Sequence, residues 1–89
     1  MKKHIELKIT GKLKNTGIRF HVMSTAYRYN IVGTVKRFSD TEVLISAEGE
    51  RIPLDNFLTW CKTGPPGGKI ENIEYSEGEL MNYSSFELI

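Results

Sequence analysis

The stretch that decides the fold reads Gly11-Lys12-Leu13-Lys14-Asn15-Thr16-Gly17-Ile18-Arg19. It follows a segment in which apolar and polar residues alternate from Ile5 to Thr10, which predicts a half-buried strand over about residues 4–12. The backbone N–H groups of such a turn converge at the start of the next helix, where the helix dipole and Arg19 add positive charge. The stretch therefore predicts a site for a small tetrahedral anion.

An amphipathic helix follows the turn. Ile18, Val22, Ala26 and Tyr29 recur at helical spacing and form one apolar face. Arg19 falls in the first turn, where backbone N–H groups lack intrahelical partners and the dipole disfavours a cation. A local preference broken at such a junction is typical of functional sites. We expect Asn30 to end the helix, since asparagine tolerates the left-handed conformation.

The rest of the chain alternates strands with one more helix. β-branched residues predict a strand over 31–38, a turn over 39–41 and a strand over 42–49. Pro53 suits the first turn of a helix whose apolar stripe consists of Leu54, Phe57, Leu58 and Cys61. Gly64-Pro65-Pro66-Gly67-Gly68 ends that helix. A strand over 69–76, with Ile73 and Tyr75 on one face, a polar loop over 77–83 and a short strand over 84–89 complete the chain.

This order predicts an α+β fold with one domain over residues 1–89. It matches the ferredoxin-like βαββαβ sandwich, in which two helices cover one face of an antiparallel sheet, here with a short C-terminal strand added. The plan hosts many unrelated functions, so it does not decide among them.

Charge and cysteine content limit the function classes. Twelve basic and eleven acidic residues nearly cancel, so no general attraction to nucleic acid or to a membrane surface is expected. Cys61 is the single cysteine and cannot form an internal disulfide, which fits a reducing compartment. Polar residues interrupt the N-terminal apolar segment, so we expect neither a signal peptide nor a membrane span. We expect a cytoplasmic monomer.

For most of the other residues with reactive or ionisable side chains, the sequence favours a structural role. Cys61 lies on an apolar stripe and is expected in the core. His4 and His21 have no second ligand at useful spacing, so we expect partly buried or surface histidines and no metal site. Four acidic residues are expected in solvent: Glu48, Glu50, Glu71 and Glu74. Three tyrosines are expected to pack in the core or at its rim: Tyr27, Tyr29 and Tyr75.

Several ordered segments resemble the acylphosphatase family. The family pattern Gly-Arg-Val-Gln-Gly-Val-Gly-Phe-Arg corresponds to residues 11–19, and Gly-Trp-Val-Arg-Asn corresponds to residues 33–37. Later motifs of the family correspond to Ala47-Glu48-Gly49, Phe57-Leu58, Gly64-Pro65-Pro66-Gly67 and Phe86-Glu87-Leu88. No single motif is specific, but the ordered set covers nearly the whole chain.

The resemblance implies hydrolysis of the mixed anhydride between a carboxylic acid and phosphate, without metal, cofactor or covalent intermediate. It implies that Arg19 binds the phosphoryl group of a small acyl phosphate, or free phosphate or sulfate. The backbone of the loop would complete the phosphate site, which then consists of Asn15, Thr16, Gly17, Ile18 and Arg19. Of these, Asn15 stands where the family has glycine, and we expect it to adopt the left-handed conformation.

The second half of the family site departs from the pattern. The family uses an asparagine on the second strand to position the attacking water, and that position is Arg37. Arginine offers only donors, so Arg37 cannot accept a hydrogen bond from water, although it can bind phosphate as a second cation. Thr16 and Thr34 are candidates for the missing acceptor. Lys12 and Lys14 flank the loop and can add to a local basic cluster.

Two interpretations follow from Arg37. In the first, the chain is an acyl phosphate hydrolase whose activity is weakened by this residue. In the second, it is a non-catalytic anion-binding or interaction module on the same fold. A third interpretation, a small RNA- or protein-binding domain, requires a basic or aromatic sheet face that the strands do not clearly supply.

Overall fold

The computed structural model describes residues 1–89 as five strands and two helices. In chain order they are β1 (Lys2–Lys12), α1 (Ile18–Arg28), β2 (Val32–Arg37), β3 (Glu42–Glu50), α2 (Arg51–Thr63), β4 (Lys69–Gly78) and β5 (Phe86–Leu88). The predicted element order is confirmed, and the bounds differ by a few residues. Strand β4 runs into the predicted polar loop, whereas α2 starts at Arg51 and has Pro53 in its first turn, as predicted.

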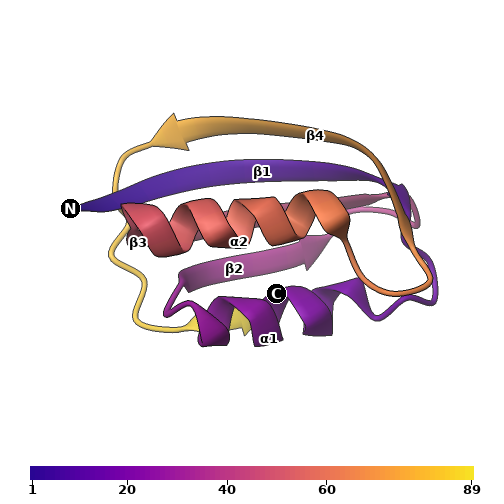
Figure 1. Cartoon of the computed structure of the whole chain (residues 1–89), viewed down its shortest axis with the longest axis horizontal. Helices are drawn as coiled ribbons and strands as arrows, with labels where there is room; N and C mark the ends of the chain where they lie inside the picture. Colours follow the sequence, from indigo (N-terminus) through magenta and orange to yellow (C-terminus); the bar gives the residue numbers. More distant parts are fainter.

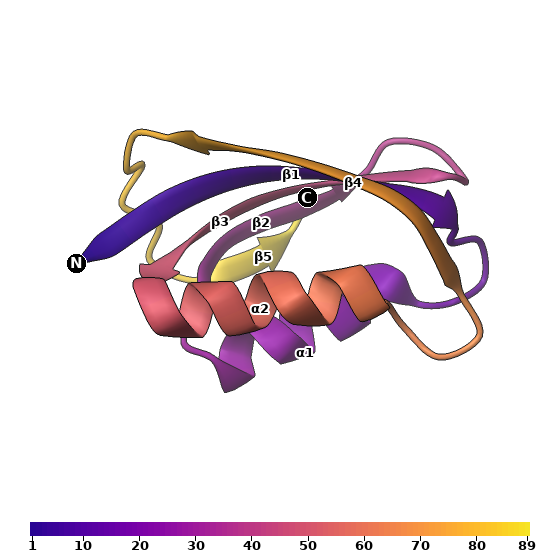
Figure 2. The ribbon, with the colours of Figure 1, turned by 45° about the horizontal axis from the view of Figure 1, so that its top comes forward.

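The strands form one sheet in the order β4-β1-β3-β2-β5 (Figure 1). The first four strands pair antiparallel, as the ferredoxin-like plan predicts, and both helices cover the same face of the sheet (Figure 2). The C-terminal strand adds a detail that the sequence did not predict. The segment after β4 crosses to the opposite edge, so β5 pairs parallel with β2, from Gly33↔Phe86 to Val35↔Leu88, and the sheet is mixed.

The core lies between the sheet and the two helices. The alternating apolar residues of β1 are buried as predicted, and so are Leu54, Phe57 and Cys61 on the stripe of α2. Phe57 meets Phe86 of β5 in an edge-to-face arrangement with ring centroids 6.2 Å apart, which ties the last strand to the core. Cys61 is a fully buried core residue as predicted, and this burial raises the pKa of its thiol to about 12.

A buried pair of polar side chains corrects two expectations. Glu48 was expected in solvent and His4 at most partly buried, yet only 2% and 4% of their surfaces are exposed. The Nδ1 atom of His4 lies 2.7 Å from Oε2 of Glu48. The Glu48 carboxylate also accepts the backbone N–H groups of Met81, Asn82 and Tyr83. Burial of a carboxylate is tolerated when it is paired and hydrogen-bonded in this way.

The remaining polar and aromatic expectations hold in part. Glu50, Glu71 and Glu74 are exposed as predicted. Tyr29 packs against the core, whereas Tyr75 is 57% exposed. Neither helix is long and apolar enough to cross a membrane.

Gly33 determines how closely β2 approaches β3. Its φ of 144° lies in the region that favours glycine, and a Cβ there would lie 1.8 Å from the Ser46 carbonyl oxygen. Any other residue would displace β2, the strand that ends at Arg37.

Candidate active site

The loop between β1 and α1 forms a tight turn held by its own backbone. Asn15 and Gly17 adopt the left-handed conformation, with φ of 62° and 67°, so the expectation for Asn15 is confirmed. The backbone N–H and the hydroxyl of Thr16 both donate to the Leu13 carbonyl oxygen, at 3.3 and 2.6 Å. A further bond, 2.9 Å from Gly11 N to Thr41 O, joins the end of β1 to the β2–β3 hairpin. The loop and the hairpin therefore lie side by side.

The N-terminus of α1 leaves several donors free. Gly17 precedes the helix, no side chain caps it, and its first turn contains no acidic residue. The N–H groups of Phe20 and His21 donate to the Gly17 carbonyl oxygen, but those of Asn15, Gly17, Ile18 and Arg19 donate to no protein acceptor. Unpaired N–H groups at a helix start, next to left-handed residues, form a binding site for anions.

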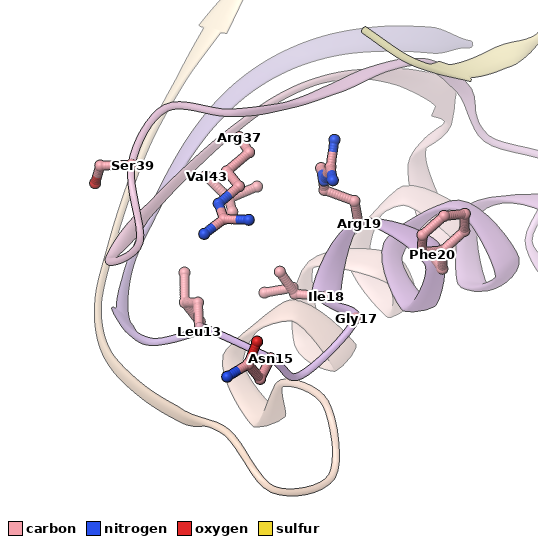
Figure 3. A pocket seen from close by; sticks show the side chains of 9 residues that line it. All are labelled: Leu13, Asn15, Gly17, Ile18, Arg19, Phe20, Arg37, Ser39 and Val43. Atoms are coloured by element: carbon pink, nitrogen blue, oxygen red, sulfur yellow. The ribbon is translucent and has the colours of Figure 1, made fainter.

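The residues that carry these donors line a pocket of about 140 Å³, whose side chains Figure 3 shows from close by. The loop, the first turn of α1 and the end of the β2 hairpin each contribute to it. The lining residues are Leu13, Asn15, Gly17, Ile18, Arg19, Phe20, Arg37, Ser39 and Val43. The structure thus brings Arg37 to the same pocket as Arg19, although the two residues lie on different elements.

The carboxylate of Asp40 organises the cations at this pocket. Arg37 Nη2 forms an ion pair and hydrogen bond with Asp40 Oδ1, three residues further along the chain. Lys14 Nζ lies 3.8 Å from the other oxygen of Asp40. Asp40 therefore holds Arg37 in place and offsets part of its positive charge, while the remaining guanidinium N–H groups stay available.

The two threonines considered as hydrogen-bond acceptors, Thr16 and Thr34, do not lie at the pocket. Thr16 is part of the loop but does not line the pocket, and its hydroxyl is committed to Leu13. Thr34 lies on β2 and does not line the pocket either. No group of three or more His, Cys, Asp or Glu side chains has an arrangement that could hold a metal ion.

Sequence reasoning missed Asp40 and Phe20. Asp40 lies three residues after Arg37, and this spacing brings the two side chains together only because the chain turns tightly between β2 and β3. Phe20 lines the pocket and is 60% exposed. Its signal in the sequence was a large apolar residue directly after Arg19 that lies off the apolar stripe of the helix.

The family model of acylphosphatase matches residues 5–88. The chain belongs to the acylphosphatase family. An acylphosphatase of Archaeoglobus fulgidus is 36% identical over 84 residues, which is 94% of each chain. Among solved structures, an acylphosphatase from Coxiella burnetii superposes with a TM-score of 0.95 at 27% identity, covering 99% of this chain and 93% of that one. An acylphosphatase from Bacillus subtilis superposes with a TM-score of 0.93 at 28% identity, covering 100% and 99%.

These similarities confirm the acylphosphatase resemblance and the fold it implied. They extend over nearly the full length of this chain and of the related acylphosphatases, so the match is to the whole fold and not to one motif.

Proposed function

We propose that this member of the acylphosphatase family hydrolyses acyl phosphates, with the phosphoryl group held by residues 15–19. The observation that carries the proposal is the group of unpaired N–H donors at Asn15, Gly17, Ile18 and Arg19, in one pocket with the Arg19 guanidinium. A planar guanidinium can bind two phosphoryl oxygens at once, and the backbone donors add directed partial charges.

Hydrolysis of an acyl phosphate needs few catalytic groups from the protein. Water attacks phosphorus, the bond from phosphorus to the acyl oxygen breaks, and the carboxylate leaves with the electron pair. Both protons of the water end on the released dihydrogen phosphate. Since a carboxylate is a good leaving group, catalysis depends on neutralising phosphoryl charge and on aiming the water. Arg19 and the loop N–H groups supply the first of these.

Arg37 supports a second candidate function, a non-catalytic anion-binding module. Its guanidinium adds a second cation to the pocket but no hydrogen-bond acceptor. Such a protein would bind phosphate or sulfate without turning over an acyl phosphate.

The test is hydrolysis of benzoyl phosphate, measured together with binding of inorganic phosphate. For the hydrolase we expect turnover that falls by about 10²–10³ or more in Arg19→Ala. The control is Arg28→Ala, in the last turn of the same helix and away from the pocket. A wild-type protein that binds phosphate through Arg19 but shows no turnover would establish the anion-binding module instead.

The variant Arg37→Asn separates the two functions further, because it restores the residue type of the family. A gain of orders of magnitude in turnover would mean that Arg37 impairs the reaction. A loss would mean that Arg37 takes part in it.

We also propose a cytoplasmic monomer that acts on a small acyl phosphate and binds no nucleic acid. The near-balanced charge and the single buried cysteine support this assignment. Light scattering on the purified protein and fractionation of cells test it.

A further inference from the structure

The pocket contains one side chain that can take the place of the missing water-orienting group. Apart from the two arginines, only Asn15 and Ser39 contribute polar side chains to its lining. The Ser39 hydroxyl is engaged within its own turn, because it accepts the Thr41 N–H at 3.2 Å and contacts the Thr41 hydroxyl at 3.3 Å. In Figure 3 the Ser39 side chain points away from the pocket. Asn15 is the remaining candidate.

The Asn15 carboxamide is available to bind a water molecule in the pocket. It lies exposed at the pocket and takes part in none of the protein's side-chain hydrogen bonds, in contrast to the Thr16 hydroxyl beside it. Figure 3 shows it at the rim opposite Arg37, with its oxygen directed toward the side on which the two arginines lie. A carboxamide offers both an acceptor and donors, which is the combination that Arg37 lacks.

The backbone explains why this residue can stand here. The φ of 62° at position 15 is a conformation that asparagine adopts more readily than most other residues with a side chain. The family has glycine at this position and asparagine at the position of Arg37. In this chain the carboxamide is found on the loop, and the strand position holds a cation.

Resting on the proposed hydrolase function, we propose that the side-chain oxygen of Asn15 orients the attacking water. The oxygen accepts one hydrogen bond from the water and takes no proton. Arg19, Arg37 and the loop N–H groups hold the phosphoryl oxygens while the water oxygen bonds to phosphorus and the carboxylate departs with its electron pair. The two water protons end on the phosphate.

The decisive variant is Asn15→Gly, assayed with benzoyl phosphate and with inorganic phosphate as a competitive inhibitor. Glycine reaches the same backbone conformation without strain, so the N–H donors stay in place. We expect kcat to fall by about 10²–10³, as for the loss of one group aimed at the reacting atoms. The inhibition constant of phosphate should change by less than about twofold, because the donors that bind it are unchanged.

Two further variants keep the test independent of folding. Asn15→Asp retains an accepting oxygen, so its kcat should exceed that of Asn15→Gly, although repulsion of phosphate raises KM. The double variant Asn15→Gly with Arg37→Asn returns a carboxamide to β2 and should recover most of the lost kcat. The matched control is Asn82→Gly, which makes the same change at an exposed asparagine with φ of 58° outside the pocket, and its activity should equal that of the wild type.

The possible outcomes separate this inference from the function on which it rests. Wild-type protein without turnover overturns both. Active wild-type protein with Asn15→Gly within about threefold of its kcat, a difference below 1 kcal/mol, overturns only the role of Asn15. An equal rise in KM and in the phosphate inhibition constant at unchanged kcat also overturns it, because the side chain would then bind phosphate and not water.

Discussion

His4 Nδ1 lies 2.7 Å from Glu48 Oε2 in the interior of the molecule, and the second ring nitrogen of His4 contacts the Glu6 carboxylate. Burial lowers the pKa of His4, but the hydrogen bonds and charges of Glu48 and Glu6 outweigh it, so this pKa is raised above 6.5. Burial acts to raise the pKa of Glu48, but the N–H groups of Met81 and Tyr83 and the His4 ring outweigh it, so this pKa is lowered below 4.5. Both shifts therefore favour the ionised form of the group concerned, the imidazolium of His4 and the carboxylate of Glu48.

The first prediction is a defined window of maximum stability. The raised pKa of His4 means that its contribution is complete below pH 6.5 and is lost as the pH rises through the folded value. The lowered pKa of Glu48 means that its contribution is complete above pH 4.5 and is lost as the pH falls through the folded value. The free energy of unfolding in urea should be highest between these limits and should fall toward alkaline pH.

The variant His4→Gln should remove the alkaline part of this decline, while His21→Gln, at the exposed histidine, should keep it. Wild-type and His4→Gln curves that run parallel from about pH 6 to pH 9 would contradict the assignment to His4.

Glu48 should also control the segment that leads to β5. Glu48→Gln removes the charge and one acceptor from a carboxylate that binds His4 and three backbone N–H groups. We expect a loss of about 1–3 kcal/mol in the free energy of unfolding. Hydrogen exchange should accelerate at Met81, Asn82 and Tyr83. Glu71→Gln, at an exposed strand residue, is the control and should change neither measurement.

Asp40 should tune the affinity of the pocket for anions. Asp40→Asn frees Arg37 and Lys14 from a carboxylate that offsets their charge. Because exposed ion pairs are worth about 0.2–1 kcal/mol, inorganic phosphate should bind up to about fivefold more tightly at low ionic strength. The gain should shrink at about 1 M salt, where the screening length is near 3 Å. Weaker phosphate binding in this variant would show that Asp40 serves mainly to hold Arg37 in the binding position.

The Cys61 thiol should be unreactive in the folded protein. It is fully buried on α2, and burial raises its pKa to about 12. A thiol reagent such as dithionitrobenzoate, which attacks the thiolate, should therefore label Cys61 only after unfolding in urea. Stoichiometric labelling within minutes under native conditions would contradict this burial.

The sequence predicted the features that depend on residues near one another along the chain. Leu54, Phe57 and Cys61 repeat with the helical period, and their shared apolar face is buried as the pattern requires. Asn15 and Gly17 are among the residue types that adopt positive φ readily, so the shape of the loop followed from local preference. The ordered motifs then placed Arg19 and the loop in one family site.

Features that depend on distant contacts were not predictable in this way. Glu48 looks like any strand carboxylate, and its partner His4 lies 44 positions away. The parallel pairing of β5 depends on where the segment after β4 crosses the molecule, which no local pattern encodes. The link between Arg37 and Asp40 depends on the geometry of the hairpin turn. Each of these features depends on which strands lie beside one another in the folded sheet.

The position of β5 affects how the molecule resists self-association. Since β5 covers the outer edge of β2, β4 is the one long strand whose edge stays open. That strand carries the exposed charged residues Lys69, Glu71, Glu74 and Glu77. An unpaired edge invites strands of other copies, and charged side chains oppose such pairing. Loss of the last few residues would uncover β2 from Gly33 to Val35, a stretch without charged residues that ends at Lys36, and would open a route to aggregation.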